Sequence, residues 1–238
     1  MIREHVHNSA WWGAPVAVVD STFFTLETAA QESALRTYAW AEFKSPFASA
    51  PCQKLAESGF ELVDMQIGFR LMLGAVQDSP SLGNLICQFA DQTPFEIESD
   101  QMQGFEHERF LCLPGASQDR VAQRYVRWAN QLVREHPEWC LRVLYQGEVQ
   151  GWFLASLTKQ GLHLALAMLS KPAQVSGLHL YQKAIHTYAA KGARIGYASF
   201  SARNTAVLNI YSQLEARFTP TEGVWLWYSK QNRAASGH

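Results

Sequence analysis

The stretch "LHLALAMLSKPAQVSGLHLYQKAIHTYAAKGARIGYASF", residues 162–200, changes from apolar to polar, then to helical, and back to apolar. Its apolar start ends a segment, 161–169, that predicts a strand, and the polar residues 170–177 predict a loop. A helix is predicted over 178–192 and a second strand over 193–200. A strand that follows a helix favours parallel pairing, so the stretch predicts a strand–loop–helix–strand unit in a mixed α/β sheet.

A capped helix and a last strand follow this unit. "NTAVLNIYSQLEARF", residues 204–218, opens on Asn204, a residue type that caps helix starts well. An apolar stripe follows, and Tyr211 lies on that stripe. "GVWLWYSK", residues 223–230, predicts the last strand, and we expect residues 231–238 to be a disordered tail.

A helix and three strands precede the unit. The helix is predicted over 119–136, where apolar residues recur at helical spacing and Pro137 helps to end it. Short turns separate three strand-like segments, 139–145, 149–158 and 161–169. The second half therefore predicts the α/β (α+β) class, with a mixed, mostly antiparallel central sheet flanked by helices.

The front half also predicts strands and helices. A strand is predicted within 15–26, a helix over 26–43, a short helix over 51–60 and a long strand over 60–73. The turn-rich residues 74–84 lie between the halves. We therefore expect two domains, with bounds 1–80 and 90–230.

An internal repeat relates the two halves. Residues 54–73 and 210–228 each predict a short helix followed by a long strand. In the front copy Leu55 takes the place of Tyr211, and that copy has neither the asparagine cap nor a Gln-x-x-Gly loop. The front half is therefore predicted to be a degenerate copy that serves packing and one wall of a pocket.

Composition excludes several classes of partner. The chain is 47% hydrophobic and 17% charged with a net charge of −1, so no basic excess favours nucleic acid or an anionic membrane surface. The longest apolar runs, such as 164–169, are too short to cross a bilayer, and the first residues do not form a secretory signal. We expect a cytoplasmic protein with no nucleic-acid partner and no membrane insertion.

The cysteines and histidines do not predict a metal site. The cysteines are widely spaced without a CxxC pair, which indicates reduced, mostly buried thiols. No residues have zinc-ligand spacing, so no metal is predicted. His5 and His7 could pair on a strand face, although solvated histidines at a chain end are the commoner outcome. The cysteines are Cys52, Cys87, Cys112 and Cys140.

The loop at 170–177 is a candidate binding site. A helix start carries unpaired N–H groups and a partial positive charge, which suit a phosphate group. Gly177 lets the backbone approach a ligand, while Gln174 and Ser176 add hydrogen-bonding side chains. Many loops between a strand and a helix contain a glycine and bind nothing, so this feature alone does not decide the function.

The order of these features resembles the acyl-CoA-binding core of the GNAT acetyltransferase superfamily. Its Q/R-x-x-G-x-G/A turn cradles the pyrophosphate of coenzyme A, and the matching turn here ends on His179, which replaces the last small residue. Its pattern N-x-x-A-x-x-x-Y-x-x-x-G-F is matched by Asn204 and Tyr211, with "LEARF" in place of Gly-Phe. The resemblance implies the GNAT fold and acetyl-CoA as co-substrate. The implied contacts are Ala167, Met168, Leu169, Gln174, Val175, Ser176, Gly177, Leu178, His179, Asn204 and Leu208.

Most of the chain also resembles the dTDP-fucosamine acetyltransferases, which acetylate a nucleotide-linked 4-amino-4,6-dideoxygalactose. Residues 177–211 follow their pattern without gaps, and "ERF" at 108–110 resembles their arginine-phenylalanine motif. The resemblance implies a dTDP- or UDP-amino sugar as acceptor, used in surface polysaccharide synthesis, with contacts from Arg109, Tyr125 and Trp128. Core packing is an equal alternative for the last two residues, and a homodimer is left open.

The resemblance implies direct attack of an amine on the thioester in a ternary complex. The amine must lose a proton, and His107 has a suitable intrinsic pKa, although a solvated charged turn is the alternative for it. A backbone N–H left free by a splayed strand near Ala167–Leu169 would stabilise the oxyanion. Tyr211, with a reference pKa of about 10, can protonate a thiolate of reference pKa about 8.5 at a cost of roughly 2 kcal/mol. Its alternative role is that of a core tyrosine.

Two other functions stay open. A GNAT enzyme could act on another small amine or on a peptide N-terminus, and a non-catalytic acyl-CoA-binding module could keep the same fold. The pair Asn204 and Tyr211 favours an enzyme, whereas His179 and the altered "LEARF" ending favour a module.

Overall fold

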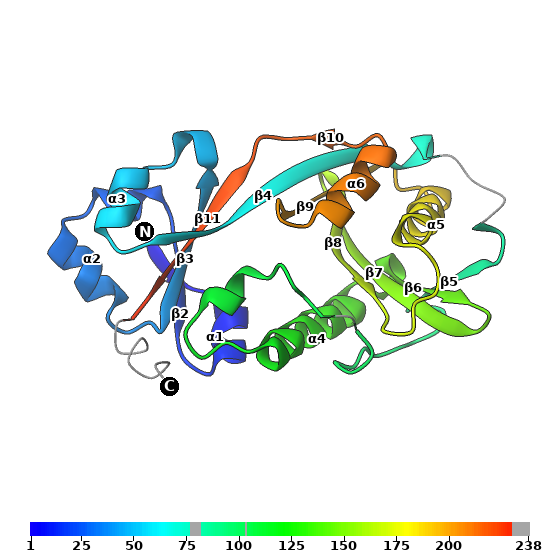
Figure 1. The fold of residues 1–238 in the computed structure, drawn as a ribbon, viewed down its shortest axis with the longest axis horizontal. Helices are drawn as coiled ribbons and strands as arrows, with labels where there is room; N and C mark the ends of the chain where they lie inside the picture. The colour runs from blue at the N-terminus through cyan, green and yellow to red at the C-terminus, as the bar shows by residue number, and fades with distance from the viewer. Residues whose placement is uncertain (77–81, 103, 230–238) are drawn as a thin grey trace.

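One continuous sheet runs through the molecule in this computed structural model (Figure 1). Within residues 1–76, 82–102 and 104–229, which the structure describes, eleven strands follow the order β1-β2-β3-β11-β4-β9-β8-β7-β6-β5, with β10 paired to β4. The strands are β1 Ile2–Glu4, β2 Val16–Val19, β3 Trp40–Pro46, β4 Glu61–Met72, β5 Leu85–Phe89, β6 Cys140–Tyr145, β7 Glu148–Thr158, β8 Gly161–Leu169, β9 Ile195–Ser201, β10 Arg217–Phe218 and β11 Glu222–Tyr228. The helices are α1 Val6–Trp12, α2 Thr28–Leu35, α3 Cys52–Glu57, α4 Gln118–Glu135, α5 Gly177–Ala190 and α6 Thr205–Gln213.

The sheet is mixed and mostly antiparallel. Among the described strands, only the pairs β2–β3 and β8–β9 are parallel. Each parallel pair is joined by a crossover that contains a helix, as such a connection requires. The predicted fold class, and the predicted parallel pairing of the strands on either side of α5, are therefore confirmed.

The two halves exchange strands. β11, near the end of the chain, lies between β3 and β4 of the front half. β4 is long enough to serve both halves, because its first part pairs with β11 and its second part pairs with β9 and β10. Figure 1 shows β4 running from α3 across to α6. Each half therefore depends on a strand that the other half of the sequence supplies.

The predicted domain bounds, 1–80 and 90–230, stay a prediction. Part of the expected boundary, 74–84, lies outside the described residues, and so does the expected tail, 231–238. The strand exchange shows that the backbone crosses between the two regions more than once.

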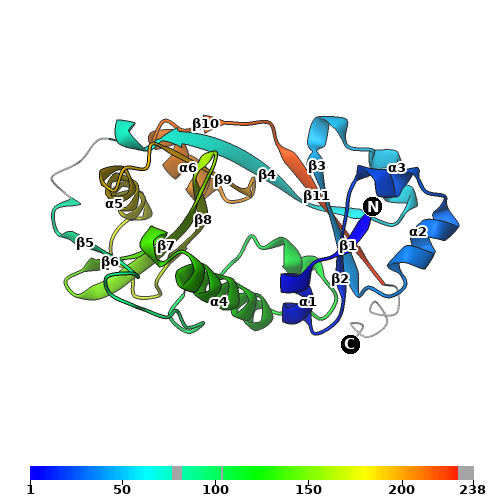
Figure 2. The same cartoon turned by 180° about the vertical axis from the view of Figure 1, so that it is seen from behind.

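Helices cover both faces of the sheet (Figures 1 and 2). In the back half, Phe153 packs in the cluster that contains α5 and α6, whereas its neighbour Trp152 packs beneath α4. Adjacent strand residues point to opposite faces, so α4 lies on the face opposite α5 and α6. In the front half, α2 and α3 cover one face and α1 covers the other.

The long helix 119–136 and the strand 60–73 are confirmed as α4 and β4. In α4 the predicted face at Val121, Ala129 and Leu132 is buried. Its start is capped by Ser117, whose side chain accepts a hydrogen bond from the backbone N–H of Arg120.

The helix predicted over 26–43 is wrong at its second half. The helix α2 stops at Leu35, and the residues from Trp40 onward form β3. β3 lies between β2 and β11, and it buries Trp40 on one face and Ala41 on the other. Burial on both faces outweighs the helix propensity of the preceding alanines and glutamates, because propensity differences are only a few tenths of a kcal/mol per residue.

No helix among the described residues is both long and apolar enough to cross a membrane.

Candidate functional site

Strands β8 and β9 diverge in the middle of the sheet. They pair only at Leu162 with Gly196 and at His163 with Tyr197. Beyond these residues β8 stays paired with β7 through Leu169, and β9 stays paired with β4 through Ser201. The edge of β8 that faces β9 therefore has no strand partner over 164–169 within the described chain, and alternate N–H groups point toward this opening.

The front half has no such opening. All four residues of β2 pair with β3, from Val16 with Trp40 to Val19 with Phe43. The turn after β2 holds Asp20, whose side chain caps a short 3-10 helix, in place of a glycine-containing loop. The helix α3 has Pro51 at its cap position with no side-chain cap bond, and Leu55 is buried. These features set the front half apart from the back half, and its origin as a degenerate copy stays a prediction.

The start of α5 lies just after β8. Ser176 caps it, because its Oγ accepts from the backbone N–H of His179 at 3.4 Å. The first backbone bond of this helix is that of Leu180 N to Ser176 O, at 3.2 Å. The N–H groups of residues 176–178 precede it and make no hydrogen bond to another described residue. Three free N–H groups at a helix N-terminus fit an anionic group such as a phosphate.

Gly177 and His179 have identifiable roles in this turn. A Cβ at Gly177 would lie 3.3 Å from Cδ1 of Ile210, so the missing side chain lets α5 begin close to α6. The half-buried His179 turns back on the cap, with its Nδ1 3.1 Å from Ser176 Oγ. The bulky residue in place of the family's small one therefore lies on the first turn of the helix.

The other predicted contacts of the coenzyme divide between the two faces. Ala167, Leu169, Val175 and Leu178 pack with the α5 and α6 cluster. Met168 faces α4 instead. Gln174 is exposed, and Leu208 is half-buried on α6.

One residue of this region was missed by the sequence reasoning. Gln150, on β7, is completely buried, and its side-chain Oε1 accepts hydrogen bonds from the backbone N–H groups of Gln174 and Val175. A single glutamine in a strand-like segment has no sequence signature of such a role.

Tyr211 lies on α6 in an aromatic cluster. Its ring is 6% exposed, and ring centroids of Phe69, Tyr181 and Phe200 lie 3.8, 5.5 and 5.9 Å away. Its hydroxyl makes no hydrogen bond to any described residue. Burial, together with the neighbouring Tyr181, raises the pKa of Tyr211 well above its ordinary value, so the hydroxyl keeps its proton at neutral pH.

Asn204 forms the predicted cap of α6. Its Oδ1 accepts from the backbone N–H of Val207 at 3.1 Å. The preceding corner is fixed from the front half, because Ser201 Oγ donates to the buried carboxylate of Asp64 on β4 at 2.6 Å.

Two of the three predicted acceptor contacts, Arg109 and Tyr125, belong to a polar network around Glu42 and Glu108. Arg109 Nε donates to Glu42 Oε2 at 3.1 Å, and its guanidinium also lies 3.6 Å from Glu108. Burial lowers the pKa of Arg109, but Glu42 and Glu108 outweigh burial and raise it. Tyr125 donates to Glu108, and Trp128 packs beside Tyr125. The guanidinium is thus already paired with the chain's own carboxylates, and its contact with a substrate stays a prediction.

His107 lies exposed in a turn before these residues. No contact of the described structure joins it to Tyr211 or to the start of α5. Its role as a base therefore stays a prediction.

Among the described residues no group of three or more His, Cys, Asp or Glu side chains is arranged to hold a metal ion. The expected absence of a metal also stays a prediction.

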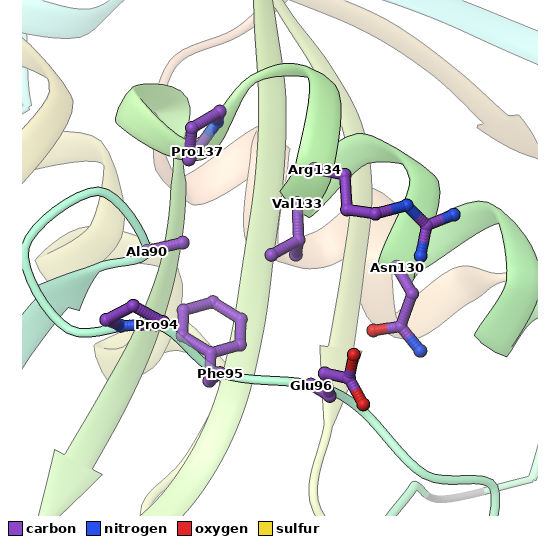
Figure 3. A pocket seen from close by; sticks show the side chains of 8 residues that line it. All are labelled: Ala90, Pro94, Phe95, Glu96, Asn130, Val133, Arg134 and Pro137. Carbon is purple, nitrogen blue, oxygen red and sulfur yellow. The ribbon is translucent and has the colours of Figure 1, made fainter.

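Two hollows lie away from the start of α5. A cavity of about 480 Å³ lies between the segment 90–96 and the last turns of α4, and Figure 3 shows the side chains that line it. Phe95 and Val133 lie at its floor, with Glu96 and Arg134 at its rim. A cleft of about 870 Å³ in the front half is lined partly by His5, His7, Glu42 and Lys44. Neither is lined by Tyr211.

Comparison with known proteins agrees with this architecture. No protein-family profile and no curated protein sequence matches the chain. Its structure is similar to that of a GCN5-related N-acetyltransferase from Sphaerobacter thermophilus, with a TM-score of 0.57 and 12% identity over 90% of this chain and 73% of that one. The fold is that of the GNAT acetyltransferases.

Other solved structures share the fold. A tandem GNAT protein from the clavulanic acid biosynthesis pathway has a TM-score of 0.53 and 11% identity over 91% of this chain and 76% of that one. A conserved protein of unknown function from Staphylococcus epidermidis has a TM-score of 0.56 and 11% identity over 91% of this chain and 84% of that one. The TM-scores show a common fold, whereas identities this low carry no activity over, so the activity of this chain has to be argued from its own residues.

Proposed function

We propose that this chain is an N-acyltransferase that moves an acetyl group from acetyl-CoA to a primary amine. The observation that carries the proposal is the opening between β8 and β9, which leads to the capped start of α5. One edge of β8 offers unpaired backbone groups to the thioester arm, and the helix start offers unpaired N–H groups to the pyrophosphate. The opening has no counterpart in the front half, where β2 pairs with β3 along its whole length.

The residues present fit the coenzyme. The N–H groups of residues 176–178 would hold phosphate oxygens, and Ser176 Oγ adds a hydroxyl beside them. The open edge of β8 near Ala167–Leu169 would hydrogen-bond the amide groups of the thioester arm and the carbonyl oxygen that becomes negative during attack.

The proposed chemistry is a direct transfer. The amine loses one proton to become a neutral nucleophile, and its nitrogen forms a bond to the thioester carbonyl carbon. As the carbon–sulfur bond breaks, the nitrogen loses a second proton to the base or to solvent, and the product is an amide. The electron pair of the carbon–sulfur bond leaves with sulfur as a thiolate, which takes up a proton to become the free thiol.

Tyr211 is the proposed hydrogen-bond donor to the leaving sulfur. Its hydroxyl has no partner in the described chain, and its raised pKa keeps it protonated. The same raised pKa makes complete proton transfer more costly than it is for an ordinary tyrosine. The hydroxyl therefore acts mainly as a hydrogen-bond donor that stabilises the thiolate, and the thiol gains its final proton from solvent.

The acceptor is proposed to be a small amine, with a dTDP- or UDP-amino sugar as the first candidate. Support for the sugar comes from the resemblance of residues 177–211 and 108–110 to the dTDP-fucosamine acetyltransferases. His107 remains the candidate base, acting directly or through water. Another small amine or a peptide N-terminus is the second candidate acceptor, and the cytoplasm is the proposed location.

Release of thiol from acetyl-CoA tests this proposal. The purified chain would be incubated with acetyl-CoA and a panel of dTDP- and UDP-amino sugars, other small amines and peptides, with an amine-free reaction as the control. Thiol release that requires one of the amines is the expected result. Binding of acetyl-CoA without turnover on any amine would instead favour a non-catalytic acyl-CoA-binding module.

A further inference from the structure

Gln150 is a completely buried amide beneath the loop that precedes α5. It lies on β7 with 0% of its surface exposed. Its Oε1 accepts from Gln174 N at 2.7 Å and from Val175 N at 3.3 Å, and its Nε2 donates to Glu148 O at 3.2 Å. A buried amide is costly unless it is hydrogen-bonded, and here both of its ends are satisfied by backbone groups.

The same strand holds the start of the loop. Ser170 N donates to Gln150 O at 3.0 Å, and Ser170 Oγ donates to Val149 O at 2.5 Å. The loop 170–176 is thus tied to β7 at its first residue by the backbone N–H and the hydroxyl of Ser170, and at its middle by the Gln150 side chain. Two separate ties fix the direction in which the chain enters α5.

This arrangement divides the backbone N–H groups of the loop into two sets. The N–H groups of Gln174 and Val175 point to Gln150 and are not free to bind a ligand. The next ones, at residues 176–178, make no hydrogen bond to a described residue. The Gln150 amide marks the point at which the backbone turns from the protein interior toward the helix start.

We propose that Gln150 is the positioning residue of the phosphate-binding turn, and that it orients the N–H groups of residues 176–178 without touching the coenzyme. This inference rests on the proposed use of acetyl-CoA. Preorganised donors bind an anion more tightly than donors that must be ordered on binding. Loss of the Gln150 amide would therefore weaken binding of the pyrophosphate and leave the rest of the coenzyme's contacts in place.

Asn130 offers a matched control. It too is a side-chain amide that holds a loop through two backbone bonds, with Oδ1 accepting from Ile97 N at 3.0 Å and Nδ2 donating to Ile97 O at 2.9 Å. Asn130 lies on α4 beside the cavity of Figure 3, on the face opposite α5. Replacing Asn130 removes hydrogen bonds like those of Gln150, but beside α4 and away from the start of α5.

The test compares Gln150→Met and Asn130→Leu with the unaltered chain. Calorimetry would measure the Kd of acetyl-CoA and of S-acetylpantetheine, which lacks the pyrophosphate. Gln150→Met is expected to raise the Kd of acetyl-CoA about tenfold, equivalent to about 1.4 kcal/mol, and to leave the Kd of S-acetylpantetheine unchanged. Hydrogen exchange of the Gln174 and Val175 amides should become faster. Asn130→Leu should change neither Kd.

A second variant, Gln150→Glu, keeps the test informative if Gln150→Met does not fold. It keeps acceptor oxygens for Gln174 and Val175 and should preserve slow hydrogen exchange at their amides. Equal affinity of Gln150→Met and the unaltered chain for acetyl-CoA would overturn the proposal, and so would an equal loss for both ligands. An unaltered chain that binds neither ligand would overturn the proposed function itself, and exchange at residues 174–175 would then show separately whether Gln150 holds the loop.

Discussion

The ring of Phe69 lies against the ring of Tyr211, with centroids 3.8 Å apart and planes inclined by 32°. Phe69 belongs to β4, which begins in the front half of the sheet, and Tyr211 lies on α6 of the back half. The front half therefore supplies part of the packing that orients Tyr211, the proposed hydrogen-bond donor to the leaving sulfur. Leu55, which takes the place of Tyr211 in the front copy, is buried as well, so packing alone does not require the hydroxyl.

Tyr211→Phe should lower kcat and leave the fold intact. The hydroxyl has no hydrogen bond to lose, so the free energy of unfolding should change by less than about 1 kcal/mol. Loss of a positioned donor should reduce kcat about 100-fold with little change in the KM of acetyl-CoA. Steady-state kinetics and thermal unfolding measure both effects.

Tyr181→Phe is the control for this change. Tyr181 is also buried, contacts Tyr211 edge to face, and makes no described hydrogen bond through its hydroxyl. The Tyr181→Phe variant should have the same kcat as the unaltered chain. If Tyr211→Phe also kept the unaltered rate, Tyr211 would be a core residue only.

Phe69→Ala should destabilise both halves together. Removing a buried phenylalanine typically costs about 3–5 kcal/mol, and β4 is shared between the halves. Hydrogen exchange in denaturant should show β3, β11 and β9 losing protection in one transition. Met72→Ala, at an exposed position on the same strand, should have a small effect. Loss of protection in β9 alone would mean that the halves unfold as separate domains.

The sequence predicted the elements that are regular over many residues. The apolar spacing of α4 and the alternation of β4 are local signals, and both elements lie where they were expected. The order of loop, helix and capped helix led to the GNAT fold. The predicted core role of the Tyr211 ring also follows from its position on the apolar stripe of α6.

The parts that sequence reasoning missed depend on distant contacts. Residues 40–43 look helical in isolation and become β3 because β2 and β11 bury them. The exchange of β4 and β11 leaves no local pattern, since any apolar strand can pair with any other. Arg109 looked free to contact the acceptor because Glu42, its partner, lies far away in the sequence.

Acid should destabilise the fold through Glu42. Burial raises the pKa of this carboxyl, but Arg109 and Lys44 more than offset burial, so its pKa in the folded chain is lowered. The resulting stability is present above the unfolded pKa, about 4.3, and is lost as pH falls through the folded value. Urea unfolding of the unaltered chain between pH 7 and 3 should therefore show decreasing stability below about pH 4.

Glu42→Gln separates this contribution from the remaining carboxyls. The variant leaves Arg109 without its closest partner and should lose about 3–5 kcal/mol at pH 7. Its further loss on acidification should be smaller than that of the unaltered chain. Glu57→Gln, at an exposed position, should change neither value by more than about 0.5 kcal/mol. An unchanged acid profile in Glu42→Gln would show that Glu42 is not ionised in the folded protein.

Alkaline conditions should destabilise the fold through its buried tyrosines. Burial raises the pKa of Tyr181, Tyr188 and Tyr211 above their ordinary value. A raised pKa favours the neutral folded form, so this stability is present below about pH 10 and is lost as pH rises above it. Tyr181→Phe should lose less stability between pH 9 and 11 than the unaltered chain, as measured by urea unfolding. Identical slopes for the two proteins would contradict the raised pKa of Tyr181.

A crystal structure with acetyl-CoA bound would show whether the start of α5 and the opening between β8 and β9 hold the coenzyme. We expect pyrophosphate oxygens within hydrogen-bonding distance of the N–H groups of residues 176–178. We also expect the thioester between β8 and β9, beside Ala167–Leu169, with its sulfur within reach of the Tyr211 hydroxyl. Coenzyme bound in the front-half cleft or in the cavity beside α4, with the start of α5 empty, would show that the proposed site is wrong.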